Sequence, residues 1–141
     1  MTHYQQLKSF LRQIVNISDE DFNELGAVLQ EKRFRKREII TGAGDIENYL
    51  YFVAKGLVRI FFLKGKREIT YDIVKEGSIT GSVSSFLTGK PSRYIVETME
   101  PSVVLVLANK DLEELYTKDN KWEKFGRLIT TNFILKQERY T

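Results

Sequence analysis

Few side chains in this sequence could take part in catalysis or bind a metal. Cysteine is absent and His3 is the only histidine, which excludes thiolate nucleophiles, disulfides and cysteine-ligated metals. Serines and acidic residues are plentiful, but a Ser-His-Asp triad or a histidine-containing metal cluster would have to use His3. That residue lies at a terminus that we expect to fray. The sequence therefore predicts a protein that is not an enzyme, with no catalytic residue and no metal site.

A basic run is the other segment whose side chains could bind a ligand. Residues 32–37 read Lys-Arg-Phe-Arg-Lys-Arg, a composition that can contact the phosphates of a nucleic acid. The formal net charge of the whole chain is only +3, which permits such a contact without requiring it. We favour the interpretation that the run is a solvent-exposed strand at the entrance of the fold.

The N-terminal part of the chain has the periodicity of helices. Ser18 precedes three acidic residues and predicts the N-cap of a helix over residues 19–31. In that helix Phe22, Leu25 and Leu29 fall on one stripe, although Gly26 weakens the prediction. A similar pattern predicts a short helix over residues 4–15. These two helices form the expected N-terminal segment.

The middle of the chain changes to strand-length segments between glycines, from about residue 32 to residue 107. Residues 67–73 alternate, with Ile69, Tyr71 and Ile73 on one face of a strand. The sequence Lys-Gly-Lys at residues 64–66 predicts the turn of a hairpin. No helix of crossover length separates the strands, so the pattern favours a sandwich or jelly roll over an α/β fold.

A helical pattern returns after Ala108. Asn109 is a plausible cap for a first helix, and a longer one follows over residues 120–139. The longer helix has a wide apolar stripe, made of Trp122, Phe125, Leu128, Ile129, Phe133 and Leu135. Packing on the β-sheets would bury part of such a stripe. Because it is wide enough for a second contact, we expect it to pair with a second copy of the chain, as a homodimer.

Five local sequences follow one another in a characteristic order: Gly42–Asp45, Tyr51–Val58, Val74–Gly81, Glu100–Leu107 and Asp111–Leu115. Together with the order of the expected elements, these segments resemble the sensor half of the cyclic-AMP receptor and fumarate-nitrate regulator (Crp/Fnr) superfamily. The resemblance covers nearly the whole chain. It implies a mainly β fold with flanking helices: a jelly roll (double-stranded β-helix) of about eight strands, short N-terminal helices and a long C-terminal dimerisation helix. The implied divisions are residues 1–31, 32–108 and 109–141.

The resemblance also implies a phosphate-binding cassette from Gly81 to Tyr94. In relatives that bind a cyclic nucleotide, backbone N–H groups after the glycine hold the phosphate. A glutamate there binds the ribose, and an arginine pairs with the phosphate. Here Ser82 stands at the glutamate position, and the arginine position falls on Ser92, one residue before Arg93. The implied ligand-binding residues are Gly81, Ser82, Val83, Ser84, Ser92, Arg93 and Tyr94. We expect three polar residues of the last helix to close over this pocket, namely Asn132, Lys136 and Gln137.

Together these features predict the ligand-sensing effector domain of a Crp/Fnr-type bacterial transcription regulator, binding cyclic AMP or another small anionic ligand. Relatives reach DNA through a winged helix-turn-helix, which this sequence, ending at Thr141, does not include. Neither a secretory leader nor a membrane-spanning run is visible, so we expect a cytoplasmic protein. The alternative is a dimeric scaffold or interaction module with a degenerate pocket that binds nothing.

Overall fold

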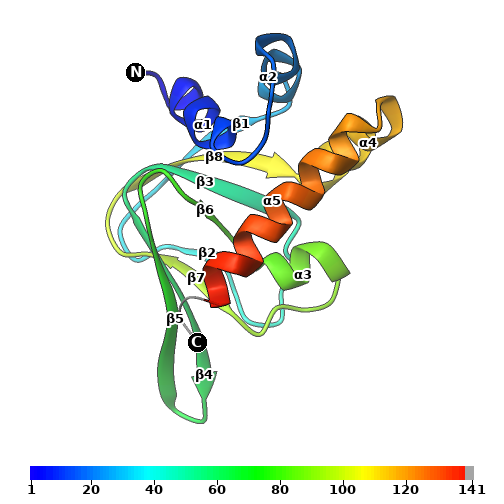
Figure 1. Cartoon of the computed structure of the whole chain (residues 1–141). Coiled ribbons are helices and arrows are strands. Elements are labelled where there is room, and N and C mark those ends of the chain that lie inside the picture. Colours follow the sequence, from blue (N-terminus) through cyan, green and yellow to red (C-terminus); the bar gives the residue numbers. More distant parts are fainter. Residues whose placement is uncertain (139–141) are drawn as a thin grey trace. The chain divides into compact units, whose positions relative to one another are not determined.

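Eight strands form two antiparallel four-stranded sheets in the computed structural model, which describes residues 1–138 and the side chains of residues 1–135 (Figure 1). One sheet has the order β1-β8-β3-β6 and the other the order β2-β7-β4-β5. The strands are β1 (Gln30–Phe34), β2 (Ile39–Thr41), β3 (Tyr49–Lys55), β4 (Leu57–Lys64), β5 (Arg67–Lys75), β6 (Ile79–Thr80), β7 (Ile95–Thr98) and β8 (Ser102–Ala108). The predicted jelly roll of about eight strands is confirmed.

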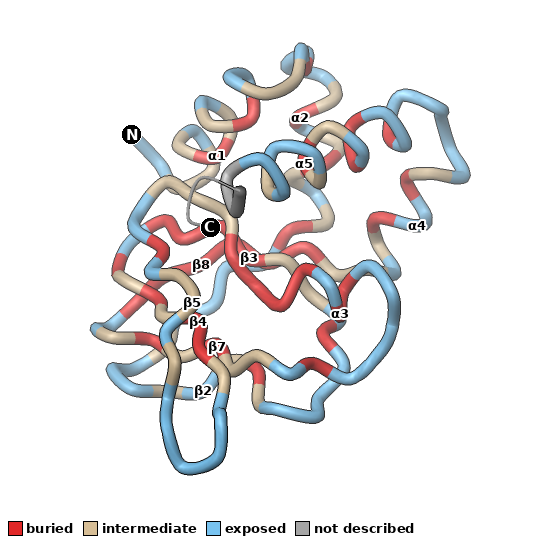
Figure 2. The backbone as a smooth tube through the Cα atoms, turned by 60° about the horizontal axis from the view of Figure 1, so that its bottom comes forward, coloured by how far each residue is buried: buried red, intermediate tan, exposed pale blue. Residues whose placement is uncertain are grey.

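The core of the roll lies between the two sheets. Apolar residues recur at alternate positions of the strands, so that one face of each sheet turns inward. Val53 of β3 and Val104 of β8 are directly paired and are both completely buried. The other members of this core are Tyr51, Val58, Ile60, Val74, Val96 and Val106. Figure 2 shows β3 as a buried strand.

The β4–β5 hairpin has the predicted turn. Lys64 pairs with Arg67, and the intervening Gly65 has a φ of 64°, a left-handed conformation that glycine adopts without steric cost. The end of the hairpin is exposed (Figure 2). The register shifts between Ile60 and Phe61, which marks a bulge in the ladder.

The helices are α1 (His3–Arg12), α2 (Asp19–Gly26), α3 (Val83–Thr88), α4 (Asn109–Lys118) and α5 (Lys121–Glu138). By its contacts the chain divides into two compact units, one of residues 29–109 and one that joins residues 1–28 to the residues from 110 onward. In the second unit Leu11, Leu25 and Trp122 are almost completely buried. An ion pair of 2.7 Å joins Lys121 of α5 to Asp21 of α2.

The predicted helix over residues 19–31 is too long at its C-terminal end. It begins as expected, with the Ser18 hydroxyl accepting a hydrogen bond from the Asp21 N–H, but it ends at Gly26. Residues 30–34 instead form β1 and pair with β8, because the sheet hydrogen bonds outweigh the helical period that Leu29 continues. Lys32 and Arg33 are exposed. This agrees with the interpretation of the basic run as a solvent-exposed strand.

None of the helices described in residues 1–138 is both long enough and apolar enough to cross a membrane.

Candidate functional site

The turn between β6 and α3 is built around Gly81. Its φ is 134°, and a Cβ atom at this position would lie 3.2 Å from Oε1 of Glu47 and 3.4 Å from the carbonyl oxygen of Tyr49. Both the backbone conformation and the close approach therefore require glycine. The helix that follows, α3, has six residues and is capped at its C-terminal end by Gly89, which has a left-handed φ of 73°. The glycine of the predicted cassette thus lies packed against Glu47 of the β2–β3 loop and against the start of β3.

Two serines occupy the positions at which the resemblance calls for glutamate and arginine. Ser82 and Ser92 are both buried, with exposed fractions of 3% and 5%, and their hydroxyl oxygens are 2.7 Å apart. The Ser92 hydroxyl also lies 3.0 Å from the backbone N–H of Tyr94, which donates to it. The structure therefore brings these two predicted site residues together, although they are ten positions apart.

The loop that carries Ser92 is fixed to the β2–β3 loop by backbone hydrogen bonds. The N–H of Gly44 donates to the carbonyl of Ser92, and the N–H of Ser92 donates to the carbonyl of Asp45, both over 2.7 Å. A carboxylate oxygen of Asp45 accepts from the N–H of Gly42 over 2.8 Å. These bonds hold residues 42–45 beside the second half of the cassette.

Glu47 is the functional candidate that sequence reasoning did not find. Its side chain is only 3% exposed. Oε1 accepts from the Ser82 N–H over 3.2 Å and from the Thr41 hydroxyl over 3.0 Å. Oε2 lies 3.4 Å from the Tyr51 hydroxyl, which donates to it. The backbone N–H of Glu47 donates to Ser85 Oγ over 2.9 Å, so the residue is held from both its backbone and its carboxylate.

Burial raises the pKa of Glu47 to about 7, although hydrogen bonds from Ser82, Thr41 and Tyr51 act in the opposite direction. The negative charge of Asp45 contributes a further small increase. No lysine, arginine or histidine pairs with this carboxylate among residues 1–135. The same environment raises the pKa of the Tyr51 hydroxyl well above its usual value, mainly through burial.

One hydroxyl in this region has no partner. Thr80 precedes Gly81, is completely buried, and its Oγ1 finds no hydrogen-bond partner within the described part of the chain. Such an atom costs free energy unless another group approaches it. The buried polar cluster, as we call it below, comprises Thr41, Glu47, Thr80, Ser82, Ser85 and Ser92.

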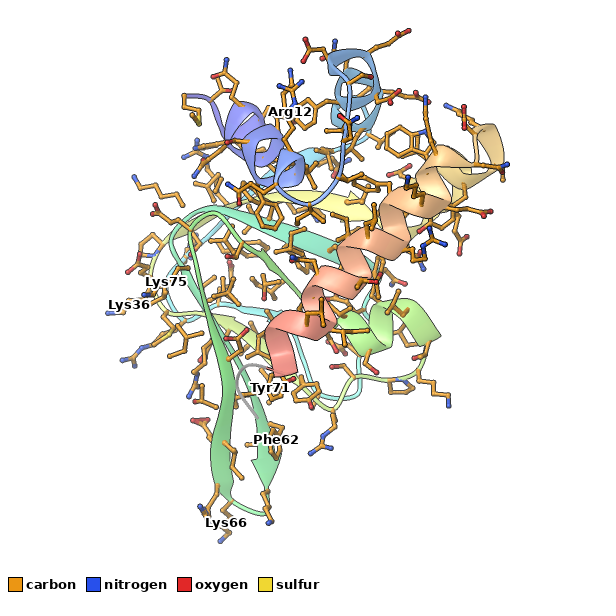
Figure 3. All side chains as sticks on the ribbon, viewed as in Figure 1. Arg12, Lys36, Phe62, Lys66, Tyr71 and Lys75 are labelled. Atoms are coloured by element: carbon orange, nitrogen blue, oxygen red, sulfur yellow. The ribbon has the colours of Figure 1, made fainter. Side chains whose placement is uncertain are left out.

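Arg93 points to a different group of residues. Its guanidinium carbon lies 4.6 Å from the ring centre of Phe62 and 5.4 Å from that of Tyr94, distances at which a cation is attracted to an aromatic face. The Tyr94 ring in turn contacts Tyr71 at 5.1 Å between centres. Figure 3 shows Phe62 and Tyr71 on the two strands of the β4–β5 hairpin. Arg93 is exposed, and it has no hydrogen bond to the buried polar cluster among the described contacts.

The remaining predicted site residues differ in exposure. Val83 is buried, whereas Ser84 and Asn132 are exposed. Lys136 and Gln137 lie in α5, but their side chains are outside the described residues. Ligand binding by any of these residues stays a prediction. In the described part of the chain, no group of three histidine, aspartate or glutamate side chains could hold a metal ion.

A model of the cyclic nucleotide-binding domain family matches residues 31–119. No curated protein sequence matches the chain. Among solved structures, it resembles a cyclic nucleotide-binding domain from Methylobacillus flagellatus KT with a TM-score of 0.85 and 19% identity. That match covers 98% of this chain and 79% of the other.

Two regulators have a similar fold. The sensor domain of the transcriptional regulator DNR from Pseudomonas aeruginosa has a TM-score of 0.74 and 22% identity, over 96% of this chain and 90% of that one. The Catabolite Activator Protein of Thermus thermophilus has a TM-score of 0.77 and 20% identity, over 93% of this chain. This chain spans 61% of the Catabolite Activator Protein. The family model covers more than half of the sequence and includes the roll with its Gly81 turn, and the chain therefore belongs to the cyclic nucleotide-binding domain family.

Proposed function

We propose that this chain is the ligand-sensing effector domain of a Crp/Fnr-type transcription regulator that acts in the cytoplasm. The family is the first support, and the similar folds of the DNR sensor domain and the Catabolite Activator Protein are the second. Binding of a small molecule in the roll, near residues 81–94, changes the balance between two conformations, provided that the ligand binds one of them more tightly. The long helix α5 transmits this change to a DNA-binding segment.

The buried polar cluster is the observation that carries the proposal. Polar side chains inside a β-roll cost stability unless they are hydrogen-bonded, and an apolar core of the same shape would be at least as stable. Here they gather at the family's ligand-binding turn, and the hydroxyl of Thr80 among them has no described partner. A ligand that offers hydrogen-bonding groups would satisfy it.

The chemistry of the cluster favours a ligand other than a cyclic nucleotide. Ser82 and Ser92 supply hydroxyls where a carboxylate and a guanidinium would bind ribose and phosphate. A hydroxyl makes a weaker hydrogen bond than an ionised group, and the guanidinium of Arg93 is stacked over Phe62 instead. A neutral, hydroxyl-rich or amide-containing small molecule matches these partners better.

A thermal-shift screen of the chain against small metabolites, with cyclic AMP and cyclic GMP included, tests this proposal. A ligand that binds the native state raises the thermal midpoint in a saturable way. We expect a neutral compound to raise the thermal midpoint. Ser92→Ala should reduce this rise more than Ser84→Ala does, because Ser84 is exposed. Micromolar binding of cyclic AMP by calorimetry would overturn the choice of ligand.

The packing of the Gly81 turn favours the second candidate, a dimeric scaffold or interaction module with a degenerate, non-binding pocket. Gly81 is packed against Glu47, Tyr49 and Tyr51, and the Ser82 N–H is already bonded within the chain. A thermal midpoint that no compound changes, together with stable dimerisation, would support this candidate over the sensor.

A further inference from the structure

The carboxylate of Glu47 meets the donors that a bound anion would meet. A backbone N–H from Ser82 and hydroxyls from Thr41 and Tyr51 converge on its two oxygens. Backbone N–H groups at a turn and neutral hydroxyls form typical anion sites in proteins. In this chain the anion is covalently part of the protein, since it is the side chain of a residue 35 positions before Ser82.

The anchoring of Glu47 leaves its carboxylate little freedom to leave this position. Its own N–H donates to Oγ of Ser85, the third residue of α3, so Glu47 is attached both to the N-cap residue Ser82 and to the helix itself. Oε1 also lies within 3.2 Å of where a Cβ on Gly81 would be. The carboxylate therefore fills the space directly above the turn.

The charges around Glu47 oppose a second anion. Asp45 is the other charged group that acts on it, and it too is negative. The other groups that face the Glu47 carboxylate are uncharged donors from β2, β3 and the Gly81 turn. The arginine of the cassette, Arg93, has its guanidinium over Phe62 and Tyr94.

We propose that Glu47 is a specificity-determining residue of this domain: its carboxylate occupies the anion position on the Ser82 amide and excludes free anions, including nucleotide phosphates. This inference rests on the proposed function only in assuming that the Gly81 turn is where ligands bind. It accounts for the presence of a buried carboxylate without a cation, which otherwise only destabilises the roll. Burial raises the pKa of Glu47 to about 7 and the three donors lower it, so the carboxylate is ionised above about pH 7.

Anion rescue of Glu47→Ala tests the proposal. The substitution leaves three donors without an acceptor and a space the size of a small carboxylate. At about pH 8, where Glu47 is ionised in the wild type, sodium formate should raise the thermal midpoint of Glu47→Ala in a saturable way. Sodium chloride of the same ionic strength is the blank. We expect an apparent formate affinity at least about tenfold higher than that of the wild type, a difference equivalent to one decade in the binding constant.

Two control variants make the result specific. Val53→Ala removes a completely buried apolar side chain of the same roll, so it is also destabilised, but its space has no donors and formate should not restore it. Glu47→Gln keeps an acceptor oxygen for the Ser82 N–H and should respond to formate no more than the wild type does. Inorganic phosphate serves as a second anion in the same thermal-midpoint measurements.

The formate experiment and the ligand screen give independent results, because formate is not a candidate for the natural ligand. Formate rescue of Glu47→Ala with no hit in the screen would support the occupation of the anion position by Glu47 and would count against the sensor function. Equal formate responses of Glu47→Ala and Val53→Ala would overturn the inference, as would tight formate binding by the wild type. If Glu47→Ala is insoluble, folding that depends on formate supports the inference. Failure of both Glu47→Ala and Glu47→Ser to recover in formate contradicts it.

Discussion

At the scale of single residues, Glu47 is the most unusual group in the roll. It is a carboxylic acid in a nearly inaccessible position, and its partners are Thr41, Tyr51 and the Ser82 amide rather than a cation. Burial without a counter-charge favours the protonated form, and this is why its pKa rises from 4.5 to about 7. The titration of this group is therefore linked to folding.

The linkage predicts that stability falls as the pH rises from about 4.5 to about 7. In this window the unfolded chain has lost the Glu47 proton while the folded chain still holds it, so the folded state binds more protons. The Glu47 contribution to the free energy of unfolding decreases by up to about 3 kcal/mol across the window and is constant above it. Urea unfolding at about pH 5 and about pH 8 measures the difference.

Glu47→Gln is the control for this prediction, because the amide has nearly the same shape and does not titrate. The variant should have a smaller fall in stability over the same pH interval than the wild type. An equal pH dependence in the two proteins would show that another group is responsible.

At the scale of elements, the sequence was informative where a pattern is local. The β4–β5 hairpin follows from the alternation of residues 67–73 and from the turn at residues 64–66. Helix α5 follows from apolar residues spaced three and four apart after residue 120. The end of α2 was not predictable from Leu29, because the competing partner is β8, more than 70 residues later. Glu47 had no local signal: an isolated acid in a loop resembles a surface residue, and its burial results from contacts with Ser82 and Ser85.

The β3–β4 connection depends on Gly56. Gly56 has a φ of 113°, and a Cβ there would lie 2.8 Å from the Cα of Ser102. Gly56→Ala must therefore move backbone as well as strain its own conformation, and we expect it to destabilise the roll by more than about 2 kcal/mol.

Gly65→Ala is the matched comparison. Gly65 also has a positive φ, of 64°, but a Cβ there meets nothing within 4 Å. Gly65→Ala should therefore lower the free energy of unfolding only through its left-handed backbone conformation, by about 1 kcal/mol. Similar urea midpoints for the two variants would mean that the contact with Ser102 relaxes easily.

At the scale of the whole molecule, α5 carries the proposed dimer contact. Trp122, Phe125 and Ile129 are buried, which accounts for one face of the helix. Leu128 and Leu135 are seven residues apart and so lie on one common face, and Leu135 is 54% exposed. Leucines that share one face of a long helix, with at least one of them exposed, are typical of a helix that pairs with a second copy of itself.

Leu135→Glu should shift the chain from dimer to monomer in sedimentation experiments at micromolar concentration, because it places a charge in the apolar contact. Leu63→Glu is the matched control: Leu63 is equally exposed, at 54%, but lies at the end of the β4–β5 hairpin. A wild-type chain that sediments as a monomer, or a dimer that both variants disrupt, would contradict pairing through α5.

The contact between Glu47 and the Ser82 amide underlies the proposed exclusion of anions, and the chemical shift of that amide reports on the contact most directly. The ¹H and ¹⁵N signals of Ser82, followed between about pH 5 and about pH 9, should titrate with a midpoint near 7 in the wild type. The same signals should be constant in Glu47→Gln. A Ser82 signal that does not change with pH in the wild type, or one that titrates identically in Glu47→Gln, would contradict it.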